Sequence, residues 1–213
     1  ALMGIPAPAS ADPVDALAAV TKSVAEQPQT RPGDLGDPAT WTDQQLAAQL
    51  LLVGATSTQL KKVKPAVAEG IGGIVLFGTP PANLAKKIAG LRAVAPGGRL
   101  LVSSDEEGGN VQRMATLIGK MPSAKTIGQT KTPEQTRALA FKFGKRMKKI
   151  GIGTDLAPVA DLSYPGSWTD TDGRAFKSNP KRNGVYVSAF AAGLKDAGVM
   201  ATVKHWPGGG AVT

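Results

Sequence analysis

Two stretches of the sequence end short apolar runs with side chains that suit a polar ligand. The first, RLLVSSDEEGGNVQRM at 99–114, carries the apolar run LLV, the acidic triplet DEE at 105–107 and a glycine pair at 108–109. Its apolar run between turn formers predicts a strand buried on both faces, with an exposed end. Carboxylates after a parallel strand are where barrel and open-sheet enzymes keep polar groups, and glycines let the backbone approach a ligand. An exposed acidic turn is the alternative interpretation of this stretch alone.

The second stretch, VMATVKHWPGGG at 199–210, predicts another short strand that delivers Lys204 and His205 at its exit. His205 is the only histidine of the chain. A single histidine is more often structural than catalytic. Its place after a lysine and before Trp-Pro-Gly at a strand end favours a functional role here.

Composition limits the classes of partner. The chain has 213 residues, of which 42% are hydrophobic, no cysteine and a net charge of +9. The absence of cysteine excludes disulfides and thiolate metal sites. A basic balance suits nucleic acid, anionic envelope polymers or an acidic ligand. The densest basic cluster, at 142–149, falls within one predicted helix without interleaved aromatic residues, which favours a solvated helix face over nucleic-acid binding. No apolar run approaches the roughly 20 residues that a membrane span needs.

The first 40 residues differ in composition from the rest. They are rich in Ala, Pro, Gly and Asp and predict an extended leader or linker, with a short helix within 14–24. Ala9-Ser10-Ala11 is similar to the pattern before a signal-peptidase cut, although no basic n-region or full apolar h-region precedes it. We therefore expect an extracellular or cell-envelope location, with the cytoplasm as the alternative. Residues 41–213 form the predicted folded domain.

Within that domain, strands and helices alternate. Predicted strands are at 50–55, 74–77, 100–102, 154–159 and 199–203, and predicted helices are at 42–49, 61–69, 82–94, 132–150 and 180–198. The alternation predicts βαβ units around a parallel sheet, either open and doubly wound or closed into a (β/α)₈ TIM-type barrel. No G-x-G-x-x-G follows the first strand, which argues against a dinucleotide-binding sheet.

Four motifs resemble glycoside hydrolase family 3, and most closely its bacterial β-N-acetylglucosaminidase branch. They are DEEGGNVQR at 105–113, APVAD at 157–161, GRAF at 173–176 and KHWPGGG at 204–210, in the family's order. The usual forms are D-x-E-G-G-R-V-Q-R, A-P-V-x-D, G-D-R-S-F and K-H-F-P-G-H-G. The resemblance covers about residues 41–210 and favours the barrel. A barrel needs eight strands and the sequence predicts about five βα units, so we expect the front part of a longer catalytic domain, or one with segments left out.

The resemblance implies a sugar site without a metal or organic cofactor. Asp105, Arg174, Lys204 and His205 match the family's sugar-binding residues. Asp105 suits an acceptor for two hydroxyls, Lys204 and His205 suit donors, and Arg174 would close the opposite side. We expect Glu106 and Glu107 to brace the loop rather than to contact the sugar. Similarly, Arg113 and Asp161 are expected to fix loops by hydrogen bonding.

The catalytic groups that the resemblance implies are not among these residues. Retaining glycosidases need a nucleophilic carboxylate and an acid/base. The resemblance places the nucleophilic aspartate on a later strand beyond Thr213, and an Asp–His acid/base pair in a loop after K-H-x-P-G-H-G. Gly209 stands where that motif has its second histidine, and Asn110 replaces an arginine. We therefore assign no catalytic residue.

Three functions stay open at this point. The chain belongs to an exo-acting retaining β-N-acetylglucosaminidase acting on cell-wall (peptidoglycan-type) fragments, to a β-glucosidase-like enzyme of the same family, or to a non-catalytic sugar-binding barrel.

Overall fold

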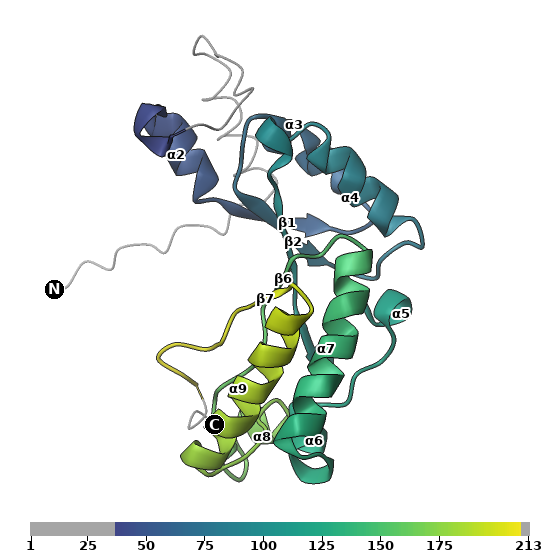
Figure 1. The fold of residues 1–213 in the computed structure, drawn as a ribbon, viewed down its shortest axis with the longest axis vertical. Helices are drawn as coiled ribbons and strands as arrows, with labels where there is room; N and C mark the ends of the chain where they lie inside the picture. Colours follow the sequence, from purple (N-terminus) through teal and green to yellow (C-terminus); the bar gives the residue numbers. More distant parts are fainter. Residues whose placement is uncertain (1–36, 210–213) are drawn as a thin grey trace, which may run out of the picture.

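The computed structural model describes residues 37–209, which form a parallel β-sheet with helices (Figure 1). The sheet has five strands in the order β1-β2-β3-β6-β7, all parallel to their neighbours. Its strands are β1 (Leu52–Thr56), β2 (Gly73–Phe77), β3 (Leu101–Ser104), β6 (Thr154–Asp155) and β7 (Met200–Ala201). A separate antiparallel hairpin pairs β4 (Glu106–Gly108) with β5 (Val111–Gln112).

The helices follow the strands in alternation. They are α2 (Asp43–Gln49), α3 (Lys64–Ala68), α4 (Leu84–Arg92), α5 (Ala115–Ile118), α6 (Ala124–Thr130), α7 (Pro133–Lys149), α8 (Trp168–Thr171) and α9 (Pro180–Asp196), with 3₁₀ turns η1 (Pro38–Thr40), η2 (Leu60–Val63) and η3 (Pro96–Gly98). The predicted helix within 14–24 and the Ala-Ser-Ala triplet lie outside the described residues. Of the predicted leader, only 37–40 are described, and they contain η1.

Local sequence signals start two helices, α2 and α7, where they were predicted to start. The Thr42 hydroxyl accepts a hydrogen bond from the Gln45 amide, and the Gln45 side chain accepts one from the Thr42 amide. Thr132 and Gln135 repeat this capping box at α7, with Pro133 at the first helical position. These reciprocal bonds satisfy amides that the first helical turn leaves unpaired.

All five predicted strands have different bounds in the structure, and the largest differences are in the first, fourth and fifth. The first strand begins at Leu52 because Leu50 is the C-cap of α2. The strand predicted at 154–159 pairs only over Thr154–Asp155, because Pro158 has no amide hydrogen to donate to a neighbouring strand. Beyond Pro158, a single bridge joins Val159 to Lys204, which follows β7. The fifth strand, predicted at 199–203, is similarly short, being Met200–Ala201 followed by that bridge.

One face of the sheet carries the core. Ile74, Leu76 and Val102 are fully buried, and they join a cluster that includes side chains of α3, α4, α7 and α9. Phe77 and Leu101, on the opposite face, are 44% and 39% exposed. The prediction that the strand at 100–102 is buried on both faces was therefore wrong, because within residues 37–209 the helical core packs against one face of the sheet.

Two glycines let α7 and α9 lie side by side (Figure 1). A Cβ added at Gly193 of α9 would lie 2.2 Å from the backbone oxygen of Arg137 and 2.8 Å from the Cβ of Ala140. On α7, a Cβ added at Gly144 would lie 2.7 Å from the Cβ of Ala197. This contact fixes the end of α9, from which the chain turns into β7 and Lys204.

We predict that Gly193→Ala destabilises the chain by about 1–3 kcal/mol because the added methyl meets backbone of α7. Gly184→Ala is the matched control on the same helix, since nothing beyond the adjoining backbone of α9 lies within 4 Å of its added Cβ. It should stabilise the chain by up to about 1 kcal/mol through helix propensity alone. Urea unfolding followed by circular dichroism measures both, and equal shifts for the two variants would contradict the packing described.

Candidate functional site

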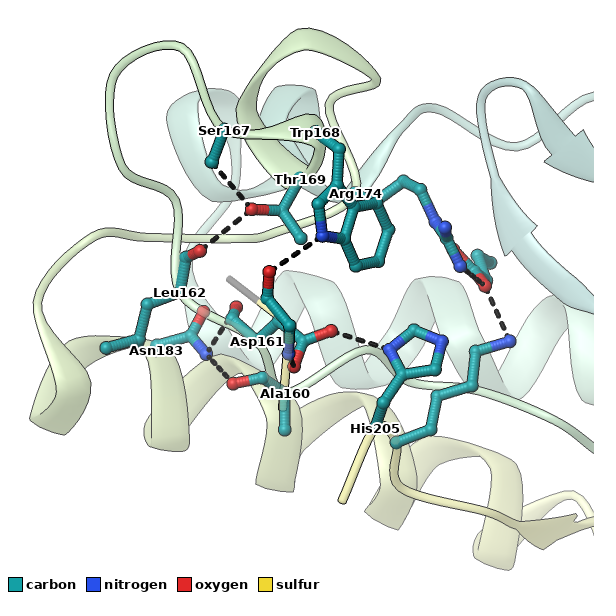
Figure 2. Close-up of polar contacts among 12 residues, drawn as sticks. Ala160, Asp161, Leu162, Ser167, Trp168, Thr169, Arg174, Asn183 and His205 are labelled. Atoms are coloured by element: carbon teal, nitrogen blue, oxygen red, sulfur yellow. Dashed lines mark hydrogen bonds and ion pairs between the residues drawn. The ribbon is translucent and has the colours of Figure 1, made fainter. Parts of the chain in front are cut away.

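The candidate site lies at the carboxyl ends of the strands, which meet at one edge of a parallel sheet. Asp105 follows β3 directly, and Lys204 and His205 lie beyond β7, where Lys204 bridges to Val159. Asp161 lies beyond that bridge on the neighbouring segment, and Arg174 follows α8. Figure 2 shows Asp161, Arg174 and His205 on separate segments, with the Asp161 carboxylate directed at the His205 ring.

The Glu107 carboxylate is shared by two cations. The Nε and Nη2 atoms of Arg174 donate to its two oxygens at 2.7 Å each, the bidentate geometry that makes arginine–carboxylate pairs strong. The Nζ of Lys204 lies 2.5 Å from Glu107 Oε1. Burial opposes ionisation of Glu107, but the hydrogen bonds from Arg174 and Lys204 outweigh it and hold its pKa below the usual value. Glu107 is thus the charged group that ties Arg174 to Lys204.

Asp105 completes this cluster on a more accessible side. Lys204 also donates to Asp105 Oδ1, so its ammonium bridges two carboxylates. The Nη2 of Arg113 lies 3.9 Å from Asp105 Oδ2. The side chains of Asp105 and Lys204 are 17% and 16% exposed, whereas that of Glu107 is 2% exposed. A ligand can therefore reach Asp105 and Lys204 without displacing Glu107.

Asp161 orients the single histidine. His205 Nδ1 lies 2.6 Å from Asp161 Oδ2, and the Gly209 amide donates to Asp161 Oδ1 at 3.3 Å. The Asp161 side chain is 2% exposed and that of His205 is 38% exposed. The buried carboxylate therefore holds the imidazole and the start of the following loop in place.

Below the cluster lies a layer of buried carboxyl groups. Glu106 accepts hydrogen bonds from the Ser104 hydroxyl at 2.5 Å and the Met114 amide at 3.0 Å, and its own amide donates to Asp155 Oδ1 at 3.0 Å. Burial raises the pKa of Glu106 to about 7, against the effect of its hydrogen bonds. Burial also raises the pKa of Asp155 well above its usual value, and the Glu106 charge adds to this shift. These two groups favour the protonated form and support the loop from inside.

The structure brings three of the four predicted site residues into one ionic cluster. Asp105 forms an ion pair with Lys204 directly. Arg174 is connected to Lys204 through Glu107, which pairs with both cations. The fourth, His205, follows Lys204 in the chain and is held by Asp161. Their role in binding sugar stays a prediction. Asp161 and Glu106 make the loop-fixing bonds expected of them, whereas Glu107 lies inside the cluster, so its role goes beyond bracing the loop.

The glycine pair brings the backbone close to another segment of the chain. An added Cβ at Gly108 would lie 2.2 Å from the Pro122 oxygen, and one at Gly109 would lie 2.7 Å from the Cβ of Ser123. Both residues have positive φ, at 89° and 58°. The close approach is thus to the chain's own 121–123 segment, and it folds the β4–β5 hairpin so that Glu106 and Glu107 point inward.

Sequence reasoning missed Trp168. It lies between the predicted strand at 154–159 and the predicted helix at 180–198, in the short helix α8. Its indole contacts Arg174, His205 and Gly209. No periodic pattern or motif marks this residue, so the sequence offered no signal for it.

Within residues 37–209, no group of three or more His, Cys, Asp or Glu side chains is placed to hold a metal ion. Over the same residues, no helix has the length and apolar character required to cross a membrane.

The raised pKa of Glu106 predicts a measurable pH dependence. Between the ordinary glutamate pKa of 4.5 and about 7, the folded chain keeps a proton that the unfolded chain loses. The folded state then binds more protons, so this group lowers stability as pH rises through that window. Glu106→Gln should remove the effect, and the variant should gain up to about 3 kcal/mol on the parent between pH 4.5 and 7.5.

Urea unfolding across this pH range measures the difference between variant and parent. Glu134→Gln is the control, because Glu134 is an exposed glutamate whose pKa is lowered, chiefly by hydrogen bonding to Thr132. A Glu106→Gln curve that runs parallel to that of the parent at all pH values would show that folding does not raise the pKa of Glu106.

A parallel α/β sheet with a charged cluster at its carboxyl edge is the arrangement of barrel-type enzymes. The glycosyl hydrolase family 3 N-terminal domain matches residues 42–213, and the chain belongs to this family. The resemblance read from the four motifs is thereby confirmed. The predicted barrel-type α/β fold with about five βα units is confirmed as well, by the five consecutive parallel strands and by the solved structures described next.

Named relatives agree with this assignment. The β-hexosaminidase LpqI of Mycobacterium tuberculosis is 39% identical over 178 residues, covering 82% of this chain and 45% of that protein. A family 3 glycosyl hydrolase from Mycobacterium smegmatis superposes with a TM-score of 0.74 at 35% identity, over 82% of this chain and 53% of that one. The β-N-acetylhexosaminidase of Beutenbergia cavernae gives 0.72 at 30% identity, over 79% and 55%. The chain thus spans about half the length of the relatives it matches.

Proposed function

We propose that this chain supplies the sugar-binding part of an exo-acting, retaining β-N-acetylhexosaminidase that releases terminal N-acetylglucosamine from cell-wall (peptidoglycan-type) fragments. The observation that carries the proposal is the cluster of Asp105, Lys204, Glu107 and Arg174 at the carboxyl edge of the sheet. The names of the relatives, β-hexosaminidase and β-N-acetylhexosaminidase, support the reaction and the sugar class.

The cluster suits a pyranose because each sugar hydroxyl both donates and accepts. Asp105 offers two carboxylate oxygens to adjacent hydroxyls, and the Lys204 ammonium beside it donates to an oxygen of the same ring. His205 adds a third group from the neighbouring position, held by Asp161. Hydrogen bonds to charged groups are worth about 1.5–3 kcal/mol each, so the loss of one should cost roughly one to two decades in affinity.

Glu107 has a supporting part in this scheme. It is almost fully buried and neutralised by two cations, so it holds Lys204 and Arg174 at the rim instead of reacting with the sugar. We assign neither the nucleophile nor the acid/base to a described residue, and the resemblance places both outside residues 37–209. The part proposed for this chain is therefore to bind and orient the ring.

We place the protein in the cell envelope or outside the cell. The Ala/Pro-rich composition of residues 1–40 supports this, and a net charge of +9 suits anionic envelope material.

A second candidate is a sugar-binding barrel without catalysis. Gly209 and Asn110 favour it, because both depart from the family motifs around the site. The β-glucosidase alternative is weaker, since the D-E-E-G-G and V-Q-R elements at 105–113 belong to the other branch.

The test is an assay of the full-length protein on an aryl N-acetyl-β-glucosaminide and on the matching aryl β-glucoside. We expect turnover of the first and little of the second. Turnover of the glucoside alone would select the β-glucosidase alternative. Calorimetric binding of N-acetylglucosamine without any hydrolysis would select the non-catalytic barrel, and absence of both binding and hydrolysis would overturn all three functions.

Asp105→Asn should weaken N-acetylglucosamine binding and lower kcat/KM by roughly 10- to 100-fold, because the amide halves the acceptor capacity facing the hydroxyls. Asp196→Asn makes the same chemical change at an exposed carboxylate of α9, paired with Arg137 at 2.7 Å, and should stay within about twofold of the parent. Equal effects of the two substitutions would remove Asp105 from the site.

A further inference from the structure

Trp168 lies where three parts of the candidate site meet (Figure 2). The Arg174 guanidinium carbon lies 4.5 Å from the centre of the indole, within the range of a cation–π contact. The His205 ring meets the indole edge-on at 5.6 Å, and the indole Nε1 donates to the Gly209 backbone oxygen at 2.7 Å. One side chain thus contacts both the Arg174 side of the cluster and the loop that carries the histidine.

The segment that carries Trp168 is held from inside. The Ser167 hydroxyl caps α8 by accepting from the Asp170 amide, and the Thr169 hydroxyl donates to the Leu162 oxygen at 2.9 Å. Ser167 and Thr169 are 1% and 0% exposed, and their hydroxyls lie 2.9 Å apart. Because these bonds fix the residues on both sides, the indole is presented in one orientation.

The indole also occupies the space beside position 209. A Cβ added at Gly209 would lie 3.2 Å from both Cζ2 and Nε1 of Trp168, closer than ordinary van der Waals contact. Gly209 does not adopt a positive φ, so the backbone conformation does not require glycine there. The departure from the histidine of the K-H-x-P-G-H-G pattern therefore coincides with a bulky ring that would have to shift to admit a side chain.

We propose that Trp168 is a positioning residue of the sugar site, which clamps the His205–Gly209 segment against Arg174 and excludes a side chain at position 209. This inference rests on the proposed function and deepens it. The indole donates to the oxygen of Gly209, and the Gly209 amide donates to Asp161. In this way the indole keeps the His205 ring in a fixed position relative to Lys204 and Asp105. If the indole is removed, Arg174 keeps its hydrogen bonds to Glu107 but loses the cation–π contact of its guanidinium with the ring.

Substitutions at two positions separate this role from general packing. Trp168→Phe keeps an aromatic face for Arg174 and loses the bond to Gly209, and Trp168→Leu loses both. Trp41→Leu is the matched control at a tryptophan next to α2. Gly209→Ala adds the methyl that the indole excludes, and it is made both in the parent and in Trp168→Leu.

We expect the affinity for N-acetylglucosamine, measured by calorimetry on the full chain, to fall about threefold to tenfold in Trp168→Phe and about tenfold or more in Trp168→Leu. The control should stay within twofold. In the full-length enzyme, Trp168→Leu should raise KM with little change in kcat, since it removes orientation of the binding groups. Thermal unfolding by circular dichroism checks that each variant is folded, and Trp168→Phe serves if the leucine variant is not.

The Gly209→Ala comparison gives the sharper result. In the parent the added methyl meets the indole and should weaken binding by about tenfold, whereas in Trp168→Leu it has room and should weaken binding less than twofold further. The ring signals of His205, the only histidine, give a readout without ligand. In nuclear magnetic resonance spectra they should shift when Gly209→Ala is made in the parent and stay unchanged when it is made in Trp168→Leu.

The outcomes keep this inference distinct from the proposed function. If the parent neither binds nor hydrolyses N-acetylglucosamine, the proposed function fails, and the His205 signals still decide whether Trp168 controls position 209. Equal effects of Gly209→Ala in both backgrounds would overturn the positioning role. Affinity in Trp168→Leu equal to that of the parent would overturn it as well.

Discussion

The bidentate pair between Arg174 and Glu107, extended by Lys204, is the interaction on which the rest of the site depends. Glu107 lies in β4, whereas Arg174 and Lys204 lie in the segments after α8 and β7, so these bonds join segments up to 97 positions apart in the sequence. The two cations, Arg174 and Lys204, balance two carboxylates, Asp105 and Glu107, so the loss of either cation leaves one negative charge of the cluster without compensation. This requirement fixes the relative positions of the loops and leaves Asp105 and Lys204 at the accessible rim.

The acids around this pair divide by environment into two groups. Glu107 keeps its charge because cations bind it, whereas Glu106 and Asp155 are buried without a cation bonded to them in the described residues and favour the protonated form. The same acidic triplet therefore supplies two groups for ionic binding, Asp105 and Glu107, and one for neutral hydrogen bonding, Glu106. This separation lets three neighbouring carboxyl groups exist close together without three charges repelling one another.

The sequence predicted the local features and the order of elements well, because both depend on nearby residues. The capping boxes at Thr42 and Thr132, the five strands and the exits that carry Asp105 and Lys204 were all visible in patterns of a few residues. Strand ends converge in any parallel sheet, so the approach of these exits followed from the alternation alone. The family motifs added Arg174, which no local pattern would have placed there.

The remaining features depend on contacts between distant segments. Glu107 meets Arg174, 67 positions away, and nothing in the acidic triplet shows which of its carboxylates will do so. The glycine pair at 108–109 packs against residues 121–123, which the sequence does not reveal. Trp168 lies beside Gly209, which is 41 positions away in the sequence. Only the folded chain shows that the indole crowds any side chain added at position 209. The exposed face of Leu101 differs from prediction because an apolar run does not show how many faces of its strand are covered.

The central claim is that two strand exits hold one pyranose ring between an acid, an amine and an imidazole. A crystal structure of the full chain with N-acetylglucosamine tests it most directly. The account predicts the sugar between the two exits, with Asp105 oxygens and Lys204 Nζ within about 3 Å of its hydroxyls and His205 beside the same ring. A sugar bound elsewhere on the chain, with Asp105 and Lys204 still bonded only to protein groups, would contradict it.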